Sequence, residues 1–318
     1  MSGAVGYVML QLAAPLLTAL LLGSLYTLMA LGLTMTYAVT SIPNFAHAEF
    51  VTIGAYIMAV AVNFGKLGLV GGLASAFLFA ALVALATDEL VFKKLAALGA
   101  TPLHLLTASI GVGLVLRYTL SIVADLKGLL SVKTRVVVNP VATIGQAYLT
   151  TLHLWAVPTT LAVVAVLHLV FMKTKIGKAM RAMASNLDLA RVSGINTTLV
   201  RRVTWVIAGG LAGVAGGFWS VYSPINPETG WVALLWIFAA SILGGFRSFY
   251  GTVLGGYVVG FSESLGITFL SRYLGVNVAY KPMIALLIIV VVFLWKPTGL
   301  AEVTPRGLLE SLKKAVGR

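Results

Sequence analysis

Four polar side chains stand in stretches of the sequence that are otherwise apolar, and their types define the chemistry they could do. Asn44, His47 and Glu49 fall close together between two apolar runs, and Glu263 lies inside the apolar run 251–271. Amide, imidazole and carboxylate groups can donate or accept hydrogen bonds to a small polar solute. Because such groups are costly at membrane depth unless they face a cavity or a partner, we take these four residues as candidates for a path across a membrane.

The segment Ile42–Phe50, with the sequence IPNFAHAEF, admits two structures. Pro43 breaks a helix because it lacks a backbone N–H donor. The polar break is then either a tight cytoplasmic turn or an unwound segment that lines a cavity, since irregular backbone at membrane depth needs such a setting. Glu49 could instead be structural, accepting hydrogen bonds from N–H groups freed at Pro43. Glu263 could equally be a helix-end carboxylate near the interface.

A second polar stretch, Lys173–Arg202, carries seven Lys or Arg residues and a single acid, Asp188. Apolar residues recur along its first half at helical spacing, as Ile176, Met180, Met183 and Leu187. This spacing predicts a short amphipathic helix, followed by a second helical piece that Gly194 ends. The stretch is either a folded knob or a solvated loop. In a knob, the apolar stripe must be buried against the membrane surface or a partner protein.

Motifs for enzymatic chemistry are missing from the sequence. It contains no G-x-x-x-x-G-K-[ST] phosphate-binding loop, so we do not expect this chain itself to bind ATP in that way. It contains no H-E-x-x-H zinc motif and no G-x-S-x-G nucleophile motif either. Cysteine is absent, which excludes disulfides and thiolate ligands. We therefore expect a non-catalytic chain with no cofactor or metal of its own.

The composition fixes the class of protein that must position these residues. The chain has 318 residues, of which 59% are hydrophobic and only 10% charged, with a mean hydropathy of +1.01. A soluble domain needs about 25% charged residues to cover its surface. The formal net charge of +13 would suggest nucleic acid in a soluble protein. Here the charges separate apolar runs, so we predict an all-α polytopic membrane protein without a nucleic-acid partner.

The apolar runs predict eight or nine transmembrane helices in a single domain, 1–318. They fall at 11–40, 49–64, 67–92, 103–125, 153–172, 203–222, 231–245, 251–271 and 280–297. Two of them, 49–64 and 231–245, are short for a crossing of ~30 Å. The first run has neither a basic leader nor a clear cleavage site, so it is expected to be retained as a span.

Basic residues between the runs predict the orientation in the membrane, because Lys and Arg concentrate in cytoplasmic loops. Phe92–Lys94, the loop 173–202, Arg247 and the short tail 298–318 are expected inside. Lys127, Lys133 and Arg135 then fall outside, which is a mild violation of the rule.

The later runs contain glycines at GxxxG spacing, which lets helix backbones approach closely. The patterns are Gly209/Gly213, Gly213/Gly217, Gly251/Gly255 and Gly256/Gly260. These glycine patterns are compatible with packing within the chain and with an interface to another subunit.

Several blocks of the sequence, in order along nearly the whole chain, closely resemble the LivH-type permeases of branched-chain amino-acid ABC importers. They are GSLYTLMALGLTMTYAVTSIPNFAHAEFVTIGAY (Gly23–Tyr56), IGKAMRAMASNLDLARVSGIN (Ile176–Asn196), INPETG (Ile225–Gly230), ILGGFRSFYGTVLGGYVVGFSES (Ile242–Ser264) and KPTGL (Lys296–Leu300). Together these blocks are specific, whereas any one of them alone would be weak.

The resemblance implies an import system in a prokaryotic plasma membrane. Its expected parts are a LivM-type permease chain, two ATP-binding cassette subunits that hold ATP and magnesium, an extracytoplasmic substrate-binding protein, and membrane lipid. The segment DLARVSG (Asp188–Gly194) is similar to the coupling loop of ABC permeases, with Asp188, Ala190 and Gly194 at its fixed positions. The resemblance thus implies that loop 173–202, with Arg181, couples to an ATPase and buries its apolar stripe in an ATPase groove.

This sequence departs from the family pattern in two places. Ala48 stands where the family usually has Gly, and Phe246-Arg247 interrupt a loop that is usually small and Gly-rich. Arg247 is then expected at the ATPase or at a lipid phosphate. The resemblance also leaves other solutes open, namely other amino acids, amides or urea, and sugars. A self-contained secondary transporter would need inverted repeats and an ion site, and neither is evident. An intramembrane enzyme would need a catalytic constellation.

Overall fold

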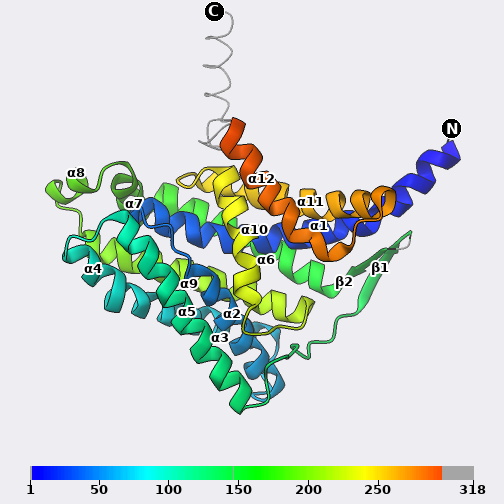
Figure 1. The fold of residues 1–318 in the computed structure, drawn as a ribbon, viewed down its shortest axis with the longest axis horizontal. Helices are drawn as coiled ribbons and strands as arrows, with labels where there is room; N and C mark the ends of the chain where they lie inside the picture. The colour runs from blue at the N-terminus through cyan, green and yellow to red at the C-terminus, as the bar shows by residue number, and fades with distance from the viewer. Residues whose placement is uncertain (1, 146, 296–318) are drawn as a thin grey trace, which may run out of the picture.

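The computed structural model describes residues 2–145 and 147–295. The predicted tail 298–318 and the Lys296–Leu300 motif lie outside them. The helices are α1 (Ser2–Thr40), α2 (His47–Asn63), α3 (Leu69–Thr87), α4 (Lys93–Ala97), α5 (Pro102–Leu126), α6 (Thr151–Lys173), α7 (Lys175–Ser185), α8 (Leu187–Val192), α9 (Thr197–Tyr222), α10 (Thr229–Gly244), α11 (Phe249–Leu274) and α12 (Lys281–Trp295) (Figure 1). A π-helix, η1 (Asp88–Phe92), joins α3 to α4, and a 3-10 helix, η2 (Val278–Tyr280), precedes α12.

Helix lengths follow the apolar runs of the sequence. Within the described residues, six helices are long and apolar enough to cross a membrane, and three shorter apolar helices accompany them. The six are Leu12–Thr40, Leu69–Ala97, Pro102–Leu126, Thr151–Lys173, Thr197–Tyr222 and Phe249–Leu274. The two runs predicted to be short are α2 and α10.

A small β-hairpin departs from the predicted all-helical structure. Strands β1 (Pro140–Ile144) and β2 (Ala147–Thr150) pair antiparallel between α5 and α6. The segment before them is too polar to span a membrane, and Pro140 cannot donate to a helix. The β-branched residues that follow suit a strand, and Gly145 adopts a positive φ of 64° at the turn.

The two ends of the bundle carry different segments of the chain (Figure 1). We call the end that carries α7 and α8 the loop end, and the end that carries β1 and β2 the hairpin end. Lys93 and Arg201 line one hollow at the loop end with residues of α7 and α8, and Arg247 lines another with Arg181. Lys127, Lys133 and Arg135 gather at the hairpin end. Among the described residues, Lys93, Arg181, Arg201 and Arg247 thus lie at the loop end, and Lys127, Lys133 and Arg135 lie at the other.

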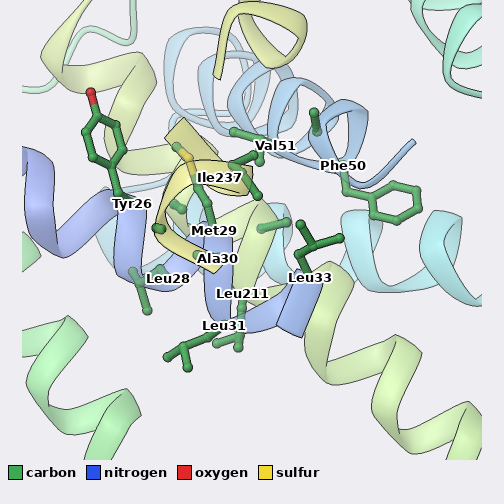
Figure 2. Close-up of a cluster of buried hydrophobic side chains, with 14 of the residues drawn as sticks. Tyr26, Leu28, Met29, Ala30, Leu31, Leu33, Phe50, Val51, Leu211 and Ile237 are labelled. Atoms are coloured by element: carbon green, nitrogen blue, oxygen red, sulfur yellow. The ribbon is translucent and has the colours of Figure 1, made fainter. Parts of the chain in front are cut away.

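Helix α1 forms the centre of the core. Nearly every side chain from Ala19 to Met35 is buried, which explains why this run has no polar face. Figure 2 shows α1 side chains beside Val51 of α2, Leu211 of α9 and Ile237 of α10, and Phe50 of α2 belongs to the same buried cluster.

The GxxxG glycines pack within the chain. A Cβ placed on Gly209 would lie 2.7 Å from the carbonyl oxygen of Ala80 on α3. A Cβ on Gly256 would lie 2.7 Å from the Thr27 Cα of α1. Such distances leave no room for a side chain, so these glycines are needed for close helix contact. The reading as packing within the chain is confirmed at these positions.

Candidate functional site

The break between α1 and α2 is a buried, non-helical segment. Asn44 is fully buried, and its Oδ1 accepts a hydrogen bond from Ala46 N at 3.1 Å. The backbone N–H of Phe45 donates to Ser109 Oγ of α5 at 3.0 Å. Side chains thus replace the helical partners that Pro43 removes. This burial disagrees with an exposed tight turn and agrees with an unwound segment inside the protein.

His47 fixes the start of α2 against the middle of α1. Its Nε2 lies 2.9 Å from the Met29 carbonyl oxygen, and the residue is fully buried. Two nitrogens of this region, Asn44 Nδ2 and His47 Nδ1, are buried without a hydrogen-bond partner among the described residues. Buried polar atoms are normally satisfied, so these two unpartnered nitrogens stand out among the described residues.

Glu49 is held by an arginine that sequence analysis missed. Arg117 Nε and Nη2 of α5 donate to Glu49 Oε1 at 3.1 and 2.7 Å. Thr52 Oγ1 lies 3.4 Å from Glu49 Oε2 and accepts from Gly230 N of α10 at 2.9 Å. The guanidinium also lies 4.4 Å from the Trp231 ring centroid. The alternative role for Glu49, accepting N–H groups freed at Pro43, is wrong, because Arg117 and Thr52 are its partners.

The Glu49–Arg117 pair joins α2, α5 and α10 inside the bundle. Glu49 is 2% exposed and Arg117 is 8% exposed. Removing one partner of such a pair costs about 3–5 kcal/mol, because the other charge stays buried. An arginine inside the predicted run 103–125 was itself a signal, since charges at membrane depth need a partner.

Glu263 accepts a short hydrogen bond of 2.6 Å from the Tyr26 hydroxyl. It is 2% exposed, which disagrees with a helix-end carboxylate at the interface. Tyr26 stacks on Trp236 at a centroid distance of 5.2 Å. Tyr26 and Met29 lie one helical turn apart on α1, so Glu263 and His47 bind neighbouring positions of one helix. The four candidate path residues thus form two groups. Glu263 lies at Tyr26 of α1, and Asn44, His47 and Glu49 lie around the start of α2, which His47 joins to α1.

The polar loop forms the two predicted helices. Thr174 caps α7 by accepting from Gly177 N at 3.0 Å, and Asn186 caps α8 by accepting from Leu189 N at 2.9 Å. Gly194 has a φ of 77°, and the following N–H of Ile195 donates to Ala190 O at 3.1 Å. This is the predicted glycine stop, in the left-handed conformation that a helix end requires.

The apolar stripe of this loop is buried in the chain itself. Met180 and Met183 are 3% and 5% exposed, and α7 packs against α1, α6 and α9. The prediction that the stripe needs a membrane surface or an ATPase groove is therefore wrong. The exposed apolar side chains of the loop lie instead on α8, where Leu189 is 64% and Val192 is 86% exposed.

The four predicted coupling residues lie in different environments. Asp188 is exposed and pairs with Arg191 at 3.4 Å, whereas Ala190 is buried. Gly194 is exposed with open space beside it. Arg181 donates to the Phe171 carbonyl at the end of α6 and thereby ties α7 to that helix.

A second ion-pair cluster joins α3 to the start of α9. Arg201 Nε and Nη2 donate to Asp88 Oδ2 and Oδ1 at 2.7 and 2.6 Å, and Asp88 is fully buried. The neighbouring Glu89 accepts from Arg202 Nε at 2.6 Å and from Lys93 Nζ at 2.7 Å. Asp88 begins the π-helix η1, a distortion that is common at functional sites. This cluster was not among the site residues predicted from the sequence, although two acids at the end of the run 67–92 were its signal.

Known proteins are similar to this sequence over nearly its whole length. The family model described as "Branched-chain amino acid transport system / permease component" matches residues 16–293. The probable branched-chain amino acid transport permease protein LivH of Methanocaldococcus jannaschii is 32% identical over 290 residues, which are 90% of this chain and 91% of that protein. The high-affinity branched-chain amino acid transport system permease protein LivH of Escherichia coli K12 is 30% identical over 88% of this chain and 92% of that protein.

One solved structure shares the fold. The structure described as PsaBC from Streptococcus pneumoniae in complex with Fab superposes with a TM-score of 0.51. The match covers 93% of this chain and 96% of that chain at 13% sequence identity. At this identity the likeness concerns the arrangement of helices alone.

Proposed function

Because this chain belongs to the branched-chain amino acid permease family, it is the membrane-spanning permease subunit of an ABC importer, and we propose that partner chains supply its energy and its substrate. The protein is a multi-pass protein of the plasma membrane. The single observation that carries this function is the family match over residues 16–293. Its test is leucine uptake by the purified complex in vesicles, which should require ATP.

The proposed partners follow from the family. A LivM-type permease chain completes the membrane path, and two ATP-binding cassette subunits hold ATP and magnesium. An extracytoplasmic binding protein delivers Leu, Ile or Val. This chain contributes no catalytic group in that scheme. Nine membrane crossings result if the shorter helices α2, α10 and α12 are all added to the six longer ones, and eight result if one of the three does not cross.

The loop end is proposed to face the cytoplasm, because its basic residues favour that side. We expect single cysteines at Ser185 and Glu228 to label from opposite sides of the membrane. Both positions are exposed, and they lie at the loop end and the hairpin end respectively. Since the native chain has no cysteine, a membrane-impermeant maleimide reports each site alone. Labelling of both cysteines from the same side of sealed cells would refute the orientation.

Coupling is proposed to act through α8 and its flanks. Leu189 and Val192 offer an exposed apolar surface to an ATPase subunit, and Asp188 and Gly194 border it. Ala190 supports this surface from inside by packing on the bundle. Arg181 takes part indirectly, because its bond to Phe171 keeps α7 in place.

The Asp88–Arg201 pair is proposed to carry motion from this loop to the bundle. Arg201 lies at the end of the loop 173–202, in the first turns of α9, and Asp88 directly follows α3, so movement of the loop pulls on both helices. Asp88→Asn should lower the number of substrates imported per ATP several-fold, because Arg201 loses the counter-charge of a buried pair. Glu89→Gln is the matched control, since the Glu89–Arg202 pair is exposed and exposed pairs contribute only about 0–1 kcal/mol. Equal uptake per ATP in the two variants would contradict this role.

The substrate path is proposed to pass the α1 segment that binds His47 and Glu263, and to continue past Asn44 and Glu49. Branched-chain amino acids are small zwitterions with apolar side chains. Weak, separated polar contacts in apolar walls suit their passage, because every ~1.4 kcal/mol of affinity slows release about tenfold. The unpartnered nitrogens of Asn44 and His47 support this assignment.

A further inference from the structure

A cavity of about 300 Å³ lies at the loop end between α1, α6, α7 and α11. Most of its wall is apolar and includes Met35, Ala38, Val39, Phe171, Met180 and Phe249. Phe171 and Phe249 meet edge to face at a centroid distance of 5.2 Å. An apolar cavity that is open to one side favours an occupant with an apolar part.

Two arginines border this cavity without a carboxylate partner among the described residues. Arg247 Nη2 donates to Ser41 Oγ at 3.2 Å, and Arg181 donates to the Phe171 carbonyl. A guanidinium carries five N–H donors, so most donors of both side chains remain free. Both residues are exposed, and both line the same cavity. Their charge is complementary to an anion, and guanidinium groups bind phosphate oxygens well.

The position of the cavity matches the boundary between hydrocarbon and headgroups. Helix α6 ends at Lys173 and α7 begins at Lys175, so the cavity lies where a membrane span gives way to a basic amphipathic helix. The exposed face of α6 is apolar along its length and reaches the cavity at Met172, which is 48% exposed. Basic pockets between transmembrane helices on the cytoplasmic side are suited to anionic lipid headgroups.

We propose that this cavity binds one anionic phospholipid of the cytoplasmic leaflet, with its phosphate at Arg181 and Arg247 and the start of an acyl chain against Phe171 and Phe249. The proposal rests on the orientation given above. A free phosphate would gain nothing from the apolar wall, and a neutral lipid would gain little from two guanidinium groups. Because α7 forms one wall, the bound lipid holds the coupling loop against α1 and α11, and anionic lipid thereby regulates import.

The test uses the complete importer complex in nanodiscs of phosphatidylcholine with increasing phosphatidylglycerol. Lipid retained by the complex is counted by native mass spectrometry, and substrate-stimulated ATPase activity is measured in parallel. Arg247→Gln should raise the phosphatidylglycerol fraction needed for half-maximal binding roughly fivefold, as expected for loss of one cation near an anionic lipid. Lys178→Gln is the matched control, because Lys178 is exposed on α7, carries the same charge and does not line the cavity.

A second variant tests the acyl chain separately from the charge. Ala38→Phe fills the cavity and leaves both arginines intact, so it should also weaken retention of phosphatidylglycerol. Inorganic phosphate should not compete with the lipid at concentrations that leave the complex intact. An equal shift in the Lys178→Gln control would mean diffuse surface attraction and would overturn the site. Cross-linking of a benzoylphenylalanine at Met172 to a partner chain instead of lipid would overturn it as well. Lipid retention is measured without transport, so a failure of the import function would not be mistaken for a failure of this site.

Discussion

Glu49→Gln is expected to destabilise the complex by about 3–5 kcal/mol, because Arg117 then stays buried without its counter-charge. The loss should appear as a lower melting temperature and a reduced yield of assembled complex. Glu263→Gln provides the matched control. Glu263 is equally buried but has a tyrosine as its partner, so the amide can still accept the Tyr26 hydroxyl at little cost.

The double variant Glu49→Gln/Arg117→Gln separates stability from transport. It removes both charges, and replacing a buried pair as a whole is often close to neutral in stability. We expect the yield to recover. If leucine uptake then stays low at normal yield, the pair contributes to the path. Uptake at the wild-type rate in the double variant would contradict a path role for Glu49 and leave the pair as a purely structural link.

Leu189→Ser/Val192→Ser on α8 is expected to abolish coupled transport while the chain still folds. The two side chains are among the most exposed apolar groups of the loop, so removing them costs the isolated chain little. Burial of such side chains in a partner is worth about 1.5–3 kcal/mol each. The affinity for the ATPase subunit should therefore fall about 100- to 10,000-fold.

The control for α8 is Leu199→Ser in the first turn of α9. Leu199 is 48% exposed and lies at the same end of the bundle, but outside α8. Pull-down of ATPase chains with each variant measures the difference. If the α8 variant retained the ATPase as well as the Leu199 variant does, the proposed contact surface would be wrong.

Local features of the fold could be predicted from the sequence because local physics decides them. The apolar runs predicted the helices, and Pro43 predicted the break between α1 and α2. The spacing of Met180 and Met183 predicted α7, and Gly194 ended α8 with a positive φ. Each of these depends on residues a few positions apart, where helix period, caps and φ preferences operate.

Long-range pairing could not be predicted in the same way. Glu49 and Arg117 are 68 positions apart, and Asp88 and Arg201 are 113 apart. A single sequence shows that each charge needs a partner but does not say which one. The same limit explains the error about the apolar stripe of α7. The spacing of its apolar residues required that this face of α7 be buried. Only the structure shows that the face is buried against α1, α6 and α9 of the same chain.

Leucine uptake driven by ATP is the most direct test of the role of this chain in an importer. The complex of this chain with the proposed permease, ATPase and binding-protein partners is placed in proteoliposomes, with ATP and magnesium on the side of the ATPase subunits and no ion gradient. We expect labelled leucine to accumulate only with ATP hydrolysis and the binding protein, and we expect competing isoleucine and valine to reduce this accumulation. Accumulation that proceeds without ATP when this chain is reconstituted alone and an ion gradient is applied would contradict this role.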